Sequence, residues 1–251
     1  MITTMTSRLH CALALAALLG LSILVPLHAY SQQGSAPAAK VPDFTGVWRT
    51  INPPDAPRVG TTLRWLPRPG ELPSFTPEYE ARYKKVQASR ETGSEETEPV
   101  TRCLPPGMPY FIFAEYGLEI VQAHNKIAFF SEWMDAYRRV YLDGRKPPKD
   151  LDPSYNGYST GHWEGDTLVV ETVGLRDDTV LDRYGSPHSD AMRISERIRL
   201  MSPDVLEDKI TVNDPKAFTK TWEFVVSYRR AGPANDELRE NTCTESLKVA
   251  K

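Results

Sequence analysis

Apolar and polar residues alternate in a series of short segments beyond residue 103, and turn-forming residues separate these segments. Alternation with a period of two is typical of a strand with one buried face, and Asn, Asp, Gly and Pro favour tight turns. The predicted strands are Leu118–Ala123, Lys126–Glu132, Ala136–Leu142, Ser159–Trp163, Thr167–Val173, Met192–Leu200, Val205–Val212 and Thr219–Arg229. This succession predicts a mainly β fold, an antiparallel sheet that is closed into a barrel or folded as a sandwich.

The clearest hairpin turn lies at Gly165 and Asp166, between a Trp-containing segment and the run Thr-Leu-Val-Val. A two-residue loop there sets the register, pairing Glu164 with Thr167, His162 with Val169 and Thr160 with Glu171. In this register Trp163 shares one face with Leu168 and Val170. His162 and Glu171 share the other face as a diagonal pair, which makes them a candidate imidazole–carboxylate dyad.

The first part of the chain has the features of a secretory signal over residues 1–29. Arg8 precedes an apolar run from Cys11 to Val25, which Pro26 and the small Ala29 follow. The run is short for a membrane span, so the mature protein is expected to have none and to be periplasmic or secreted. Residues 30–41 read as a flexible leader, and residues 42–251 as a single β-rich domain. A formal net charge of −3 gives no electrostatic reason to bind nucleic acid.

Two further features complete the expected fold. Thr76 and Pro77 begin one short N-terminal helix that runs to about Ser89. The first strand, near residues 42–49, contains Gly46-x-Trp48, which resembles the opening of lipocalin-like (calycin) barrels. That resemblance implies that the Trp closes one end of a barrel beneath a basic side chain.

The two cysteines outside the signal segment are Cys103 and Cys243. In a chain directed to an oxidising compartment they are predicted to form a disulfide, and the alternative is two separate buried thiols.

Glu196 is the most informative carboxylate. It alternates with Met, Ile and Leu on one strand face, whereas arginines occupy the other face. A buried carboxylate needs a partner or a raised pKa, so Glu196 is either a general acid/base or half of an internal salt bridge, unless a bulge turns it outward. On a neighbouring strand Arg139 shares a face with Tyr137 and Tyr141, which makes Arg139 a candidate partner and Tyr141 a candidate pocket residue. A surface strand is the alternative there.

The histidines are weaker candidates. His162 is a plausible base if Glu171 orients its ring, and His188 lies in a loop before the Glu196 strand. Three histidines remain outside the signal, without the spacing of a zinc site, so no metal is expected. No phosphate-binding glycine loop is visible, so no cofactor is expected either.

Several stretches together resemble a largely uncharacterised family of exported, β-rich bacterial proteins. They are Pro42-Asp-Phe-Thr-Gly-Val-Trp48, Glu119-Ile-Val-Gln122, Arg139-Val-Tyr-Leu-Asp-Gly-Arg145, Gly161-His-Trp-Glu-Gly-Asp-Thr-Leu-Val-Val-Glu-Thr172, His188-Ser189 and Glu196-Arg197. The resemblance implies a secreted single domain and assigns no catalytic residue.

Three functions remain open. The first is a barrel that binds a small, mostly apolar molecule in its cavity. The second is a cofactor-independent lyase, isomerase or cyclase, in which Glu196 and His162 move protons while Arg139 and Tyr141 stabilise negative charge. The third is a non-catalytic envelope interaction protein. The enzyme hypothesis requires Glu196, Arg139 and His162 or His188 to converge on one cavity.

Overall fold

The computed structural model describes residues 41–51, 58–59, 62–63, 72–92, 99–113, 116–234 and 236–241. All of them belong to one compact unit, residues 39–251. The signal segment 1–29, the leader up to residue 40 and Cys243 lie outside the described residues, so the signal, the leader and the disulfide stay predictions. Among the described helices, none has the length and apolar character needed to cross a membrane.

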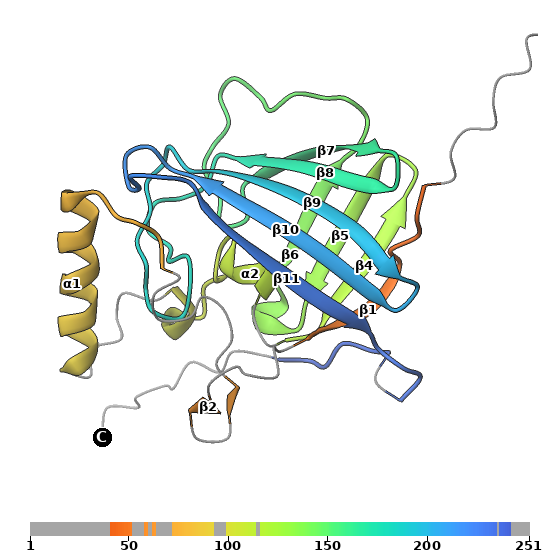
Figure 1. Ribbon diagram of the computed structural model, residues 1–251, viewed down its shortest axis with the longest axis horizontal. Coiled ribbons are helices and arrows are strands. Elements are labelled where there is room, and N and C mark those ends of the chain that lie inside the picture. Colours follow the sequence, from red (N-terminus) through yellow and green to blue (C-terminus); the bar gives the residue numbers. More distant parts are fainter. Residues whose placement is uncertain are drawn as a thin grey trace, which may run out of the picture. The chain divides into compact units, whose positions relative to one another are not determined.

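Nine strands form a closed barrel in the order β1-β11-β10-β9-β8-β7-β6-β5-β4, and β1 pairs with β4 to complete the ring (Figure 1). Their bounds are β1 Gly46–Thr50, β4 Leu118–Ala123, β5 Lys126–Ser131, β6 Tyr137–Tyr141, β7 Tyr158–Glu164, β8 Thr167–Val173, β9 Arg193–Ser202, β10 Val205–Asn213 and β11 Trp222–Arg230. The predicted mainly β fold is confirmed, and of the two predicted architectures the chain adopts the barrel. A separate pair, β2 (Arg58–Val59) and β3 (Thr62–Leu63), forms a two-stranded sheet.

The short N-terminal helix is α1, Pro77–Glu91, which has Pro at its first position as the sequence predicts. Its last turns dock on the loop before β9, where Gln87 Nε2 and Arg90 Nη1 donate to the carbonyls of Tyr184 and Arg183 at 2.6 and 2.7 Å. The other helical turns are η1 (Pro99–Arg102), α2 (Tyr110–Phe113) and η2 (Trp133–Asp135).

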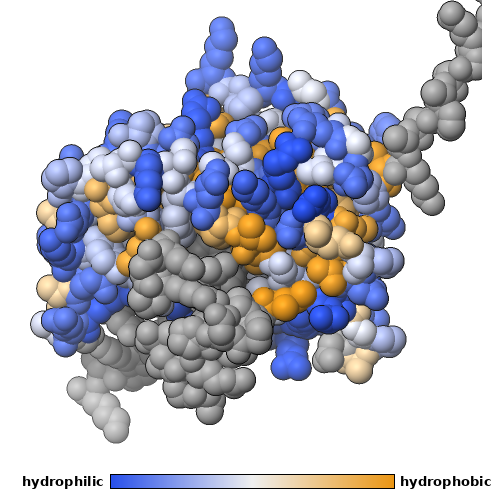
Figure 2. All heavy atoms as spheres, in the orientation of Figure 1, coloured by the Kyte–Doolittle hydropathy of each residue, from blue (hydrophilic) through white to orange (hydrophobic). Residues whose placement is uncertain are grey.

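Helix α2 packs against the inner face of the barrel. Its Phe111 and Ile112 are almost fully buried in the core cluster, and the Tyr228 hydroxyl of β11 donates to the Ile112 carbonyl. The outward positions of β9 and β10 carry charged side chains such as Arg197, Arg199 and Lys209. Hydrophilic side chains accordingly cover much of the described surface in Figure 2.

Trp48 of β1 is fully buried, and the guanidinium of Arg230 on β11 lies 4.2 Å from the centroid of its ring. The indole N–H donates to the Phe44 carbonyl at 2.8 Å, and Arg230 also donates to the Thr45 carbonyl. The basic side chain that the lipocalin-like opening implies is therefore present, and it joins the first and last strands of the barrel.

The β7–β8 hairpin has the predicted register, with Glu164 opposite Thr167, His162 opposite Val169 and Thr160 opposite Glu171. Leu168 and Val170 are fully buried, whereas His162 and Glu171 are exposed. The inward face of this hairpin is thus the apolar one.

The contact between β6 and β7 differs from every other neighbouring pair in the barrel, because these two strands run parallel. Only Val140 opposite Ser159 and Tyr141 opposite Thr160 are in register. Nearer the start of β6, where no β7 residue is in register, the Asn156 side-chain amide donates to the Tyr137 carbonyl at 2.8 Å. The first three residues of β6, Tyr137–Arg139, therefore have no partner on β7.

Candidate functional site

A buried ion pair lies inside the barrel. The alternation of β6 turns Arg138 and Val140 inward, and that of β9 turns Glu196 inward between Ile194 and Ile198. Arg138 is 2% exposed and Glu196 0%. Arg138 Nη1 donates to Glu196 Oε1 at 2.8 Å, and Nη2 donates to Oε2, so the pair is bidentate. The salt-bridge interpretation of Glu196 therefore holds, with a different partner from the one expected.

The predicted partner, Arg139, is wrong because it lies on the other face of β6. Arg139 is exposed on the outer surface together with Tyr137. The sequence held the needed signal: Arg138 shares its face with Val140 and Leu142, and the more apolar face of a barrel strand is the inward one.

Two hydroxyls complete the binding of Arg138. Its Nε donates to Ser159 Oγ at 3.1 Å, and Nη2 lies 3.4 Å from Thr172 Oγ1. The two hydroxyl oxygens are 2.8 Å apart and form a hydrogen bond with each other. The ring of Phe129 lies 5.4 Å from the guanidinium carbon. All of these groups are buried, so the polar cluster is a fixed part of the core.

Asp208 of β10 is a second buried carboxyl beside Glu196, and sequence reasoning missed it. Burial raises the pKa of Asp208 well above its usual value, and the adjacent charge of Glu196 raises it further. One oxygen of Asp208, Oδ1, is buried without a hydrogen-bond partner among the described residues, and an ionised carboxylate is costly in such a place. The signal was again alternation, because Leu206, Asp208 and Ile210 occupy one face of their strand.

The predicted dyad does not form. The His162 ring lies 3.2 Å from Glu164 Oε1 on the outer surface. Glu171 instead accepts a hydrogen bond from the Ser195 hydroxyl at 2.6 Å.

His188 is buried, but its ring nitrogens contact Thr179 Oγ1 at 2.7 Å and the Ser189 carbonyl at 3.1 Å. Burial lowers the pKa of His188. Neither this histidine nor His162 contacts Glu196, so the convergence that the enzyme hypothesis requires is not found.

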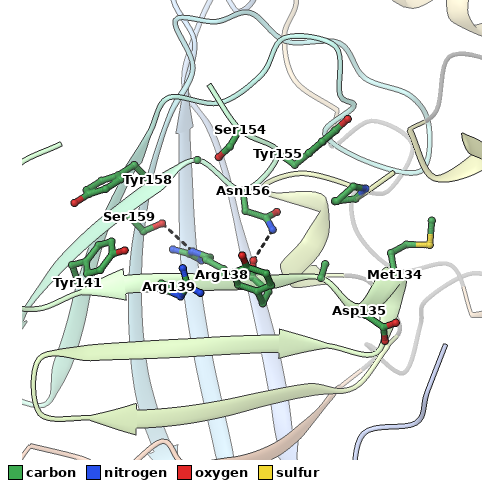
Figure 3. A pocket seen from close by; sticks show the side chains of 14 residues that line it. Met134, Asp135, Arg138, Arg139, Tyr141, Ser154, Tyr155, Asn156, Tyr158 and Ser159 are labelled. Carbon is green, nitrogen blue, oxygen red and sulfur yellow. Dashed lines mark hydrogen bonds between the residues drawn. The ribbon is translucent and has the colours of Figure 1, made fainter. Parts of the chain in front are cut away.

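A hollow of about 350 Å³ lies where β6 and β7 separate (Figure 3). It is lined by Pro105, Met134, Asp135, Ala136, Tyr137, Arg138, Arg139, Tyr141, Ser154, Tyr155, Asn156, Gly157, Tyr158 and Ser159. Two sequence-predicted site residues, Arg139 and Tyr141, belong to it, whereas Glu196, His162, His188 and Glu171 do not. Its polar lining includes Arg138 and Ser159, so the hollow reaches from the surface to the buried polar cluster.

Four tyrosine rings line this hollow. The rings of Tyr141 and Tyr158 stack with centroids 5.2 Å apart, and Tyr137 and Tyr155 add two more. Gly157, which precedes Tyr158, has φ +65° and a backbone so close to Val173 that an added Cβ would lie 2.7 Å from its carbonyl oxygen. The chain therefore needs glycine there to bring Tyr158 against the wall.

Guanidinium groups lie over three of these four tyrosines. Arg139 is 4.8 Å from the Tyr137 centroid, Arg145 is 4.1 Å from that of Tyr141, and Arg176 is 4.9 Å from that of Tyr155. The opposite end of the hollow carries Met134 and Asp135, which have φ of +59° and +46°. These positive φ values belong to the left-handed backbone conformation, which costs energy for residues other than glycine. Such strain is concentrated at functional sites.

No group of three or more potential metal ligands occurs within the part of the chain that the structure describes.

No family model and no curated protein matches this chain. Among solved structures, the fluorescent protein UnaG is similar, with 15% sequence identity, coverage of 75% of this chain and 97% of that chain, and a TM-score of 0.33. A single-site mutant of UnaG is similar with 13% identity, coverage of 75% and 96%, and a TM-score of 0.33.

Proposed function

We propose that this chain is an exported small-molecule-binding protein whose ligand occupies the hollow between β6 and β7. The observation that carries the proposal is the hollow beside the short parallel contact of β6 with β7, which four tyrosines line. A volume of about 350 Å³ lies within the range of small-molecule pockets.

The composition of the hollow supports binding. Tyrosine rings supply large, rigid apolar surfaces that lose little conformational entropy when a ligand binds. Stacking of Tyr141 on Tyr158, and of Arg145 on Tyr141, holds these rings in place before a ligand arrives. A few polar groups, among them Arg139, can orient a ligand.

The hollow between β6 and β7 is better suited to hold a ligand than the centre of the barrel, which side chains fill. Large side chains from several strands and from α2 are 2% exposed or less in the described core, including Trp48, Phe111, Ile120, Ile127 and Leu168. The polar cluster around Arg138 occupies part of the same interior. The small, mostly apolar molecule expected from the sequence is therefore assigned to an aromatic hollow in the wall.

The lyase, isomerase or cyclase alternative gains no support from the geometry. Both oxygens of Glu196 accept hydrogen bonds from Arg138, and the two histidines lie elsewhere. No observation favours the envelope interaction alternative.

The proposal is tested by filling the hollow with a large side chain. Ser154→Trp places a large ring in the lining, and Met201→Trp, at an exposed position in β9, is the matched control. Wild type and Met201→Trp should be stabilised against heat by members of a library of small aromatic compounds, whereas Ser154→Trp should not. Tyr141→Ala, which removes a stacked ring without filling space, should weaken the same ligands. Equal stabilisation of Ser154→Trp and the control, with both folded by circular dichroism, would contradict the proposal.

Export has its own test. Cell fractionation and mass measurement of the mature N-terminus should find a periplasmic or secreted protein that lacks about the first 29 residues. An intact N-terminus in the cytoplasm would contradict it.

A further inference from the structure

Arg139 differs from the other arginines around the hollow. Arg138 is paired with Glu196, Arg145 with Asp143 and Arg176 with Asp178. Among the residues that the structure describes, no carboxylate pairs with Arg139. Its guanidinium lies over the Tyr137 ring, 4.8 Å from the centroid.

The surroundings of Arg139 keep its guanidinium available. Its cross-strand neighbour on β5 is Ala128, a small side chain that cannot pair with it. Tyr137 and Tyr141 flank it two residues away on the same outer face of β6. Figure 3 shows Arg139 on the side of the hollow that Tyr141 occupies, with Asp135 at the far side. An unpaired guanidinium beside aromatic rings suits a carboxylate or sulfonate, because its planar fork binds such groups through two parallel hydrogen bonds.

From these contacts we infer that the hollow binds a small aromatic anion, with its ring against the tyrosines and its acidic group on Arg139. The inference rests on the proposed function and specifies its ligand class. A cation is disfavoured because guanidinium groups already lie over three of the four tyrosine rings and repel a further positive charge. A neutral hydrocarbon ring could not form the two parallel hydrogen bonds that a guanidinium makes with an acidic group.

Two fluorescent probes with the same skeleton test the charge requirement. Anilinonaphthalene sulfonate carries an anionic group on an aromatic system, and N-phenyl-naphthylamine is its uncharged counterpart. Titration of the wild-type protein should give a clearly tighter dissociation constant for the sulfonate, and that affinity should fall as salt is raised. Equal affinity for the two probes would overturn the inference while leaving the proposed function standing.

Variants locate the interaction. Arg139→Gln should weaken sulfonate binding about tenfold, which corresponds to about 1.4 kcal/mol, with little change for N-phenyl-naphthylamine. Arg229→Gln removes an exposed positive charge on β11, outside the hollow, and should leave both titrations unchanged. An equal loss in Arg139→Gln and Arg229→Gln would reduce the effect to general surface charge and overturn the inference.

The Ser154→Trp variant distinguishes the inferred ligand class from the proposed function. If Ser154→Trp abolishes binding of both probes, the hollow is their site, and only the comparison of the probes then judges the ligand class. If both probes bind Ser154→Trp as they bind wild type, or if neither binds wild type, the inference fails, and the library test with Ser154→Trp and Met201→Trp judges the proposed function by itself.

Discussion

Arg138 on β6 and Glu196 on β9 form a two-point ion pair inside the barrel, across the two strands that separate them in the sheet. The strand that carries Arg138 has only two residue pairs in register with β7. The side-chain pair therefore holds β6 to the rest of the barrel where the backbone ladder is thin. Since β6 also lines the hollow, this pair fixes the position of the candidate site.

Glu196→Gln should strongly destabilise the protein, because it leaves the Arg138 charge buried without its partner. Removal of one member of a buried pair typically costs about 3–5 kcal/mol. Urea denaturation at neutral pH measures the loss. The double variant Arg138→Met with Glu196→Met should recover much of it, since replacing both members with apolar groups leaves no unpaired charge. If Glu196→Gln has wild-type stability, the ion pair does not hold the barrel together.

Asp208 gives a prediction with a defined pH dependence. Its pKa is raised in the folded protein by burial and by Glu196, so the folded state retains a proton that the unfolded chain releases above about pH 4. Stability linked to this group is fully present below that pH and decreases as the pH rises toward the folded pKa.

Asp208→Asn should remove this pH dependence, because an amide of similar size stays uncharged at every pH and so avoids a buried charge beside Glu196. Each pKa unit of difference between the folded and unfolded states corresponds to about 1.4 kcal/mol. The variant should therefore be more stable than the wild type at pH 7, and the difference should shrink toward pH 4. Parallel stability curves for the two proteins from pH 4 to 8 would contradict the assignment of the proton.

The strands were predictable from the sequence because each buries one face, and the two-residue turn at Gly165 and Asp166 fixed the hairpin register. The same alternation places Glu196 inside, and it was sufficient to place Arg138 and Asp208 there as well. The choice of Arg139 as the partner went against that pattern. If the face of β6 that carries Arg139 had pointed inward, three polar side chains, those of Tyr137, Arg139 and Tyr141, would lie toward the core.

The hollow could not be predicted in the same way. It depends on a parallel contact between β6 and β7 and on the connection of residues 142–157 between them, which has no periodic pattern. Asn156 belongs to this connection and bonds to the first residue of β6. The predicted dyad failed for a related reason: a correct register places His162 and Glu171 on one face, but tertiary closure decides that this face points outward.

Arg230 over Trp48 predicts a measurable contribution to the closure of the barrel. Arg230→Ala should reduce the free energy of unfolding by about 1–2 kcal/mol, through the lost cation–π contact and the lost hydrogen bonds to backbone carbonyls. Arg229→Ala, the exposed neighbour, should change it by less than about 0.5 kcal/mol. Guanidinium chloride denaturation of both variants measures the two changes in the free energy of unfolding. Equal losses in Arg230→Ala and Arg229→Ala would show that Arg230 acts only as surface charge.

The disulfide between Cys103 and Cys243 stays a prediction with a direct test. Denatured, unreduced mature protein should react with no thiol reagent, and reduction should release two thiols. Closing so long a loop should contribute roughly 3–5 kcal/mol in the chain-entropy model. Two reactive thiols before reduction would contradict the pairing.

Glu132 ties the C-terminal segment to the barrel, and its titration should control that attachment. Burial alone raises the pKa of Glu132, but hydrogen bonds from the backbone N–H groups of Gly117 and Arg239 and from Arg49 outweigh it and hold the pKa below its usual value. The bond from Arg239 to Glu132 Oε1 is 2.9 Å long, and that from Arg49 is 2.7 Å. The stabilisation is therefore present above about pH 4.3, the usual value for Glu, and is lost as the pH falls through the lowered folded value.

Glu132→Gln should consequently reduce stability by about 1–3 kcal/mol at pH 7, and the difference from wild type should narrow below pH 4. In limited proteolysis at pH 7, the variant should lose residues beyond about 236 sooner than the wild type, because Arg239 has lost its charged acceptor. Glu207→Gln, whose carboxylate pairs with Arg199 on the exposed surface, is the matched control and should show neither effect. Cleavage at equal rates in all three proteins would mean that Glu132 does not hold the C-terminal segment.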